Sequence, residues 1–251
     1  MERSRQWAVR CVHEAQLHEF NAFITLTYND EHLPSDGSLN HRDFQLFMKR
    51  FRTSISPKRF KFYMCGEYGS KHGRPHYHAL IFGYDFEDKR LHQVRRGIPI
   101  FTSEELSALW GMGFCTTGDV TFESAAYCAR YIMKKVTGNE AEEYYNGRKP
   151  EYTAMSRGGT RGKGLSYQWF MKYKDDVYPY DEVVLKGKRL RPPRFYDGLY
   201  EQHDPKGFQE VRRKRISAGK RHVAEQTPER LKAREKVQLA KLSMLKRELD
   251  T

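Results

Sequence analysis

The stretch RPHYHALIFG, residues 74–83, decides the fold of this chain. Its apolar run between Pro75 and Gly83 predicts a strand over His76–Gly83. Residues two apart in a strand leave the same face, about 7 Å apart along the chain, so His76 and His78 share a face. A second predicted strand, Arg59–Glu67, comes just before it across the short basic loop YGSKHGRP. The order and the short link predict an antiparallel pair.

Glu67 ends the first of these two strands. If the strands pair, its carboxylate lies beside both imidazoles and completes a set of two histidines and one carboxylate. Mixed nitrogen and oxygen ligation with open positions suits Mn²⁺ or Mg²⁺ in phosphate chemistry. Zinc is the alternative metal, although no thiolate joins the set. The alternative to any metal is a His-x-His pair on an exposed sheet face with nothing bound.

A second motif, YCARYIMKK, falls on a predicted helix over residues 123–136. Tyr127 and Tyr131 are four residues apart and therefore lie on one face, with a rise of about 6 Å between them. Lys134 joins that face, and the other side of the helix is apolar (Ala125, Ala129, Ile132 and Val136). The alternative is a pair of half-buried structural tyrosines whose hydroxyls are bonded at the rim of the core.

Together the two motifs predict attack by a tyrosine on a DNA phosphate. A phenol has a pKa of about 10, so it is a weak nucleophile at neutral pH unless a cation stabilises the phenolate. A metal would polarise the phosphate, and Lys134 and Arg130 are placed to stabilise developing charge. The product would be a 5′-phosphotyrosine that reseals without ATP. In agreement, SRGGTRGKGLS lacks the register of a phosphate-binding P-loop, and we expect no nucleotide cofactor.

The rest of the chain predicts an α+β domain with an antiparallel sheet, because strands alternate with helices and some are linked as hairpins. We expect an endonuclease domain over residues 1–185 and a basic extension with a C-terminal helix over 186–251. The stretch GNEAEEYYNGRKP is predicted to be a polar loop. Further predicted elements are helices at 4–19, after the cap Asn40, at 102–110 and after the cap Thr227, and strands at 20–28 and 114–120.

Composition limits the partners of the protein. The 251 residues carry a formal net charge of +13, which predicts a polyanion: nucleic acid first, an anionic membrane surface second. No apolar run approaches the roughly 18–20 residues that cross a bilayer, and the start lacks the apolar stretch of a signal peptide. We therefore expect a soluble intracellular protein. The four cysteines form no CxxC pair and are predicted to be small buried hydrophobes.

Two basic segments are candidate DNA contacts. Arg157, Arg161 and Lys163 lie among glycines that let backbone amides approach phosphates. The segment Lys186–Arg221, which includes Arg191 and Arg194, holds 12 Lys and Arg against 4 Asp and Glu. We expect it to bind the DNA backbone in a strongly salt-dependent way. The alternatives are a solvated turn and a solvated basic tail.

Three motifs carry a family resemblance: FITLTY (residues 23–28), the block from EYG to HYH, and YCARYIMKK. They resemble the motifs of HUH rolling-circle replication initiators. The two-tyrosine form is similar to the replication proteins of microviruses of the gokushovirus type. Four other segments extend the resemblance over most of residues 3–200: RSRQWAVRCVHEA, HRDFQLFMKRFR, MSRGGTRGKG and KGKRLRPPRFYD.

This resemblance implies a central antiparallel sheet with flanking helices, the HUH endonuclease fold. It implies a metal on Glu67, His76 and His78, and Tyr127 and Tyr131 as nucleophiles. It further implies single-stranded origin DNA of a phage as substrate, a host helicase and replication machinery as partners, and the cytoplasm of a bacterial host as location. Relatives often carry a cysteine-rich stretch ahead of the RSRQWA segment, and we expect any metal knuckle or origin contact of that stretch to lie outside this sequence.

Other functions remain open from the residues alone. Within the same chemistry the chain fits a plasmid relaxase, while the pair of tyrosines argues against a single-tyrosine transposase. A metal-dependent nuclease that uses water would need the tyrosines only as structural residues. A non-enzymatic DNA-packaging protein would need only the positive charge.

Overall fold

The computed structural model describes residues 2–69, 73–157 and 164–244, with the backbone alone at 131–134 and 242. The chain divides after Lys172 into two compact units. The predicted division of roles between residues 1–185 and 186–251 stays a prediction.

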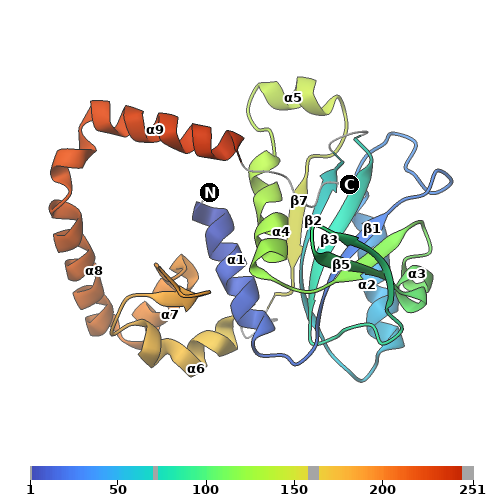
Figure 1. Cartoon of the computed structure of the whole chain (residues 1–251), viewed down its shortest axis with the longest axis horizontal. Coiled ribbons are helices and arrows are strands. Elements are labelled where there is room, and N and C mark those ends of the chain that lie inside the picture. Colours follow the sequence, from blue (N-terminus) through green and yellow to red (C-terminus); the bar gives the residue numbers. More distant parts are fainter. Residues whose placement is uncertain (1, 70–72, 158–163, 245–251) are drawn as a thin grey trace. The chain divides into compact units, whose positions relative to one another are not determined.

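A seven-stranded antiparallel sheet forms the centre of the first unit, which confirms the predicted α+β fold (Figure 1). The strand order is β4-β5-β6-β1-β3-β2-β7. In chain order the strands are β1 (Asn21–Thr27), β2 (Lys61–Tyr68), β3 (Pro75–Phe82), β4 (Arg90–Arg95), β5 (Ile98–Thr102), β6 (Cys115–Gly118) and β7 (Tyr152–Met155).

Strand β3 is buried along its whole length and pairs with β1 and β2, as the sequence predicts for β2. Its side chains alternate between two faces. Tyr77, Ala79 and Ile81 belong to one large hydrophobic core. His76 and His78 therefore point to the opposite face. A shift by one residue would exchange these two sets, so the register is set by the burial of both faces.

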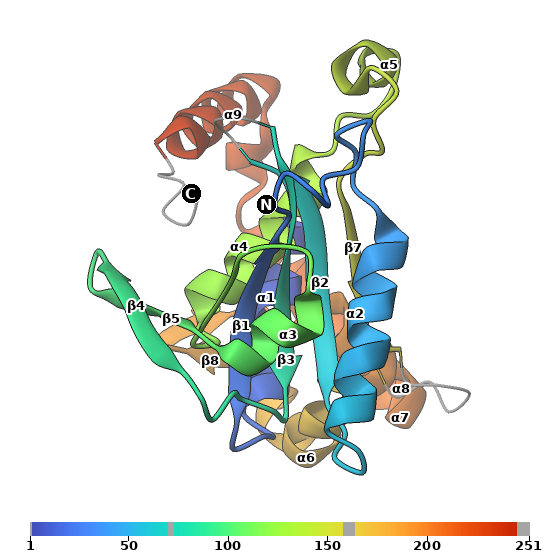
Figure 2. The ribbon, with the colours of Figure 1, turned by 90° about the vertical axis from the view of Figure 1, so that its right-hand side faces the viewer.

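Helices α2 (His41–Ser54) and α3 (Glu104–Trp110) cover the face with the large core (Figure 2). The predicted caps are confirmed. The Asn40 side chain accepts a hydrogen bond from the backbone of α2, and Ser103 does the same for α3. The side chains of α2 that enter the core are Phe44, Phe47, Met48 and Phe51.

Helices α1 (Glu2–Ala15) and α4 (Phe122–Lys134) pack against each other on the opposite face, and α4 also packs on β2, β3 and β7 (Figure 1). Thr121 and Ser124 form a reciprocal capping box that fixes the start of α4. Cys128 of α4 is buried here, and the other three cysteines are also buried free thiols, as predicted.

Two regions of the first unit differ from the sequence prediction. The polar loop predicted at GNEAEEYYNGRKP is wrong, because it contains helix α5 (Glu140–Tyr145). A tertiary contact that local pattern does not show stabilises this short helix: the buried Tyr145 hydroxyl donates to Glu151 and accepts from the backbone of Val136. The β4–β5 hairpin was not predicted either, since its strands are largely exposed and lack clear alternation.

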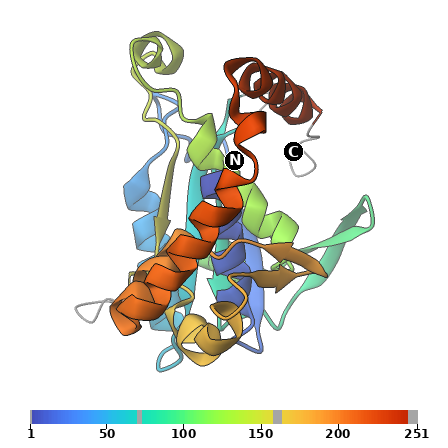
Figure 3. The same ribbon diagram turned by 90° about the vertical axis from the view of Figure 1, so that its left-hand side faces the viewer.

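The second unit is a hairpin with helices (Figure 3). Helix α6 (Tyr167–Val177) contains the division point. After it come β8 (Val183–Leu185), β9 (Lys188–Leu190), α7 (Arg194–His203), α8 (Pro205–Lys220), the 3₁₀ helix η2 (Val223–Gln226) and α9 (Pro228–Ser243). Arg215 of α8 bridges Asp181 and Asp197. The basic segment Lys186–Arg221 thus includes a strand and two helices.

Candidate metal centre

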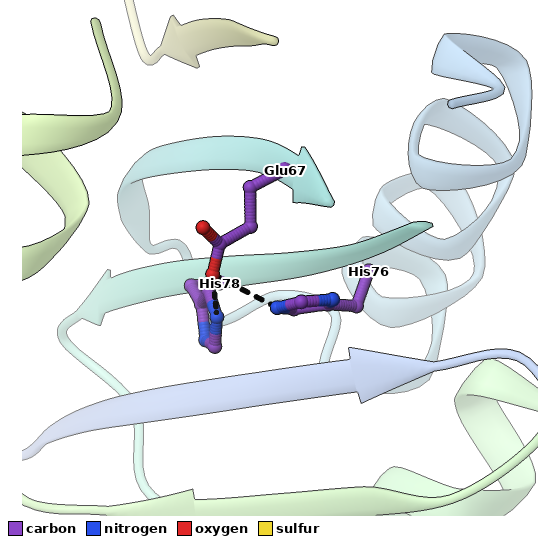
Figure 4. Close-up of side chains that lie close together, drawn as sticks. All are labelled: Glu67, His76 and His78. Atoms are coloured by element: carbon purple, nitrogen blue, oxygen red, sulfur yellow. Dashed lines mark hydrogen bonds and ion pairs between the residues drawn. The ribbon is translucent and has the colours of Figure 1, made fainter. Parts of the chain in front are cut away.

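Three side chains on neighbouring strands converge on one point (Figure 4). Oε1 of Glu67 on β2 lies 2.8 Å from Nε2 of His76 and 2.8 Å from Nε2 of His78, both on β3. All three residues are buried, and their ligand atoms lie within 4.8 Å of one another. The cause is the register, which pairs Glu67 with His76. The juxtaposition that the sequence predicts is present.

The outer nitrogens of both imidazoles are held by neighbours. Nδ1 of His76 lies 3.0 Å from the carbonyl oxygen of Arg74, which only accepts, so Nδ1 carries the proton. Nδ1 of His78 lies 2.9 Å from the hydroxyl of Thr25. Metal-bound histidines are held in this way, with the remaining lone pair on Nε2.

The donor set fits a divalent cation. In neutral His76, Nε2 presents a lone pair to a carboxylate oxygen, and these two repel unless a cation lies between them. Burial opposes ionisation of Glu67, but the contacts with His76 and His78 outweigh it and lower the pKa of Glu67 to about 2. The carboxylate is therefore charged at neutral pH, which is the form that binds a cation.

The phenol of Tyr127 belongs to the same cluster. Its hydroxyl donates to Oε1 of Glu67 at 2.9 Å and lies 3.4 Å from Nε2 of His78. Its ring meets the ring of His78 edge-on, with centroids 4.9 Å apart. The side chain is buried, so packing of α4 on the sheet fixes the hydroxyl at the candidate metal site. Tyr127 is thus bonded to the ligand set itself.

The other predicted site residues are not gathered in this way by the described structure. The backbone of Tyr131 lies one turn further along α4, but the side chains of Tyr131 and Lys134 are outside the described residues, as are Arg161 and Lys163. Three more are exposed: Arg157 after β7, and Arg191 and Arg194 in the second unit. Arg130 on α4 is half-buried. Their roles stay predictions.

Sequence reasoning missed two residues at this site, both in the FITLTY stretch. Thr25 holds the outer nitrogen of His78, and Phe23 stacks on the His78 ring with centroids 5.6 Å apart. Alternation along β1 places both on one face, and Thr25 pairs with His78 in the register. That pairing joins residues far apart in sequence, so the local pattern could not name them.

The fold and the site define an α+β protein with a buried centre of two histidines and one glutamate, and a tyrosine hydroxyl on that glutamate. Residues 21–136 match the family model of the replication-associated protein ORF2. This match runs from β1 through α4 and contains the whole centre. The chain belongs to this family of replication-associated proteins.

Three curated relatives support the family, and all are phage proteins. The chain is similar to the replication-associated protein VP4 of Bdellovibrio phage phiMH2K, with 34% identity over 84% of the chain and 67% of the relative. For ORF2 of Spiroplasma virus 4 the identity is 32%, over 80% of the chain and 65% of the relative. For ORF4 of Chlamydia phage 1 it is 30%, over 79% and 50%. The chain thus spans between half and two thirds of these relatives.

The resemblance to microviral replication proteins is confirmed by these relatives. No solved structure is significantly similar to the chain. Within the described residues, no helix has both the length and the apolar character that crossing a bilayer requires.

Proposed function

We propose that this protein initiates rolling-circle replication of phage DNA as a metal-dependent tyrosine endonuclease of the HUH type. It nicks one strand of origin DNA, holds the 5′ end as a phosphotyrosine, and later rejoins the strand to release single-stranded circles. The observation that carries this proposal is the 2.9 Å bond between the Tyr127 hydroxyl and the Glu67 carboxylate. Membership of a replication-associated family supports the role in replication initiation.

The cleavage step exchanges one phosphodiester for another. The phenol oxygen of Tyr127 attacks the phosphorus, the bond from phosphorus to the 3′ oxygen breaks, and a tyrosyl phosphodiester forms. The phenol loses one proton, for which Oε1 of Glu67 is an acceptor at 2.9 Å, and the 3′ oxygen gains one proton. Since no phosphodiester is lost, the reverse reaction reseals the strand without a nucleotide cofactor. Mn²⁺ or Mg²⁺ held by the Glu-His-His set supplies positive charge for the phosphate oxygens.

Tyr131 supplies the second nucleophile in this proposal. It lies one helical turn from Tyr127 on α4, so both phenols can serve one site. One tyrosine keeps the 5′ end through a replication round while the other cuts the regenerated junction. Lys134 and Arg130, on the same helix, stabilise the developing negative charge.

The substrate and partners follow from the same proposal. The net charge of +13 supports binding to single-stranded origin DNA, with backbone contacts from Arg157, Arg161, Lys163, Arg191 and Arg194. Unwinding comes from a host helicase and the host replication machinery, in the cytoplasm of the bacterial host.

The decisive experiment tests for covalent attachment. Protein is incubated with labelled single-stranded origin DNA and Mn²⁺, and the products are separated on denaturing gels. We expect an adduct that survives SDS, fails to form in EDTA, and disappears when Tyr127→Phe and Tyr131→Phe are combined. Exposed Tyr144 is the control, and Tyr144→Phe should leave the adduct intact. Cutting without an adduct would indicate a nuclease that uses water, and binding without cutting would indicate a packaging protein.

A further inference from the structure

An exposed aromatic side chain lies in the same cross-strand row as the candidate metal centre. Thr27 pairs with His76, which pairs with Glu67. On the other side of Thr27, its backbone N–H donates to the carbonyl oxygen of Phe114 at 2.9 Å. Side chains in one row of a sheet point to one face, so Phe114 faces the same side as the centre. Two strand spacings, about 10 Å, separate its backbone from that of His76.

The position of Phe114 depends on Gly113. This glycine has φ +148°, and a Cβ atom there would lie 2.3 Å from the carbonyl oxygen of Thr27. Only glycine lets the chain approach β1 so closely and bring the next residue into register. Phe114 is nevertheless 53% exposed, which is unusual for a residue held so firmly on the sheet.

A second ring completes a platform with Phe114. His92 is exposed at the irregularity of β4 between Leu91 and Gln93, and its ring centroid lies 5.3 Å from that of Phe114. The bulge turns His92 toward this ring, and bulges commonly re-aim a side chain next to an active site. Two rings of this kind offer a face on which a nucleic-acid base can stack.

The hairpin that carries His92 is basic. Residues 90–102 contain Arg90, Arg95 and Arg96 and no acidic residue. At its tip Arg96 and Gly97 both have positive φ (49° and 79°), as in the two-residue turns that suit twisted hairpins. The hairpin extends from the β4 edge of the sheet (Figure 2). Its charge favours a phosphate backbone running past the two rings.

We propose that Phe114 and His92 form a stacking platform for an unpaired base of single-stranded DNA that adjoins the scissile phosphate, with the β4–β5 hairpin along its backbone. The inference rests on the proposed function for the nature of the strand and adds a site that holds it. A base stacked here keeps the neighbouring phosphate close to Glu67, His76 and Tyr127.

Binding without cleavage tests the platform. The probe is a dye-labelled oligo(dT), titrated with the full chain in EDTA and followed by fluorescence anisotropy. Phe114→Ala should weaken binding about 10-fold or more, whereas Phe114→Tyr keeps a ring and should stay close to the unchanged protein. Phe20→Ala is the matched control, because Phe20 is 57% exposed just ahead of β1, and it should change nothing. Thermal unfolding of each variant verifies that it is folded.

A single abasic nucleotide, moved along the oligonucleotide, gives a second readout. The unchanged protein should lose affinity at one position, and Phe114→Ala should be insensitive there, because the same stack cannot be lost twice. Failure of the chain to bind the probe, equal affinity of Phe114→Ala, or equal losses in Phe114→Ala and Phe20→Ala would overturn the inference. If binding depends on Phe114 but no covalent adduct forms with Mn²⁺, the platform stands and the proposed endonuclease fails.

Discussion

Tyr127 on α4 donates a 2.9 Å hydrogen bond to Glu67 on β2, although the two residues are sixty positions apart in the chain. The same oxygen of Glu67 lies 2.8 Å from Nε2 of both His76 and His78. One carboxylate therefore links the proposed nucleophile to the proposed metal ligands. Changes at Glu67 should affect metal binding and tyrosine chemistry together.

Glu67→Gln should abolish tight binding of Mn²⁺. The amide has nearly the shape of the carboxylate but no charge, and a neutral oxygen is a poor partner for a divalent cation. Because loss of a supporting residue alone costs about 10–100-fold in metal affinity, we expect loss of a ligand to cost about 100-fold or more. Isothermal titration calorimetry with MnCl₂ measures this.

A buried glutamate elsewhere in the same unit is the control for that variant. Glu151 is also buried and also accepts from a tyrosine hydroxyl, that of Tyr145. Glu151→Gln should leave the affinity for Mn²⁺ unchanged. Equal losses in both variants would show that the effect is a general one on folding, and would remove Glu67 from the ligand set.

Thr25→Val should weaken the same metal site without breaking the fold. Valine keeps the shape of threonine and suits a strand, but it cannot bond Nδ1 of His78. Such supporting bonds hold a histidine ligand in orientation, and we expect a loss of about 10–100-fold in Mn²⁺ affinity. Thr116→Val, at the position that pairs with Thr25 on β6, is the control. Unchanged affinity in Thr25→Val would mean that His78 needs no such support.

Gly113→Ala should destabilise the first unit. The left-handed φ of +148° and the approach to the Thr27 carbonyl both oppose a Cβ atom. Strain and clash together predict a loss of about 3 kcal/mol or more in the free energy of unfolding. In contrast, Gly198 lies within α7 with open space around it, so Gly198→Ala should stabilise the protein by up to about 1 kcal/mol. Urea unfolding of both variants distinguishes these opposite signs.

The stability of the protein should fall between pH 7 and pH 5, partly through His13. Burial lowers the pKa of His13 to about 3, so the folded protein keeps this ring neutral. The unfolded chain takes up a proton below about pH 6.5, which favours unfolding as the pH falls toward the folded value. One such group contributes about 2 kcal/mol of lost stability between pH 7 and pH 5.

His13→Phe isolates this contribution. Phenylalanine keeps a ring for stacking on Trp169, whose centroid lies 3.5 Å from that of His13, but it does not titrate. Urea unfolding at pH 7 and pH 5 should therefore show a smaller difference for His13→Phe than for the unchanged protein. Exposed His32 is the control, and His32→Phe should keep the full difference. A full difference in His13→Phe would mean that His13 is already charged in the folded state.

Much of the fold was predictable from short-range pattern. Periodicity and caps predicted α2 and α3, and the short basic loop predicted the antiparallel pairing of β2 and β3. The same pairing placed Glu67 beside His76 and His78 before any coordinates. Where local signals were weak, prediction failed: α5 is stabilised by the contact between Tyr145 and Glu151, and the exposed β4–β5 hairpin lacks an apolar face.

The sequence by itself determined which residues share a face of one strand or one helix, because side-chain direction repeats with a fixed period along each element. That is enough to put His76 with His78 and Tyr127 with Tyr131. Only the tertiary structure decided that Tyr127 reaches Glu67, that Thr25 holds His78, and that Phe114 stands in the row of His76. These relations depend on the register and packing between elements distant in the chain, which burial of the whole sheet fixes and no local pattern records.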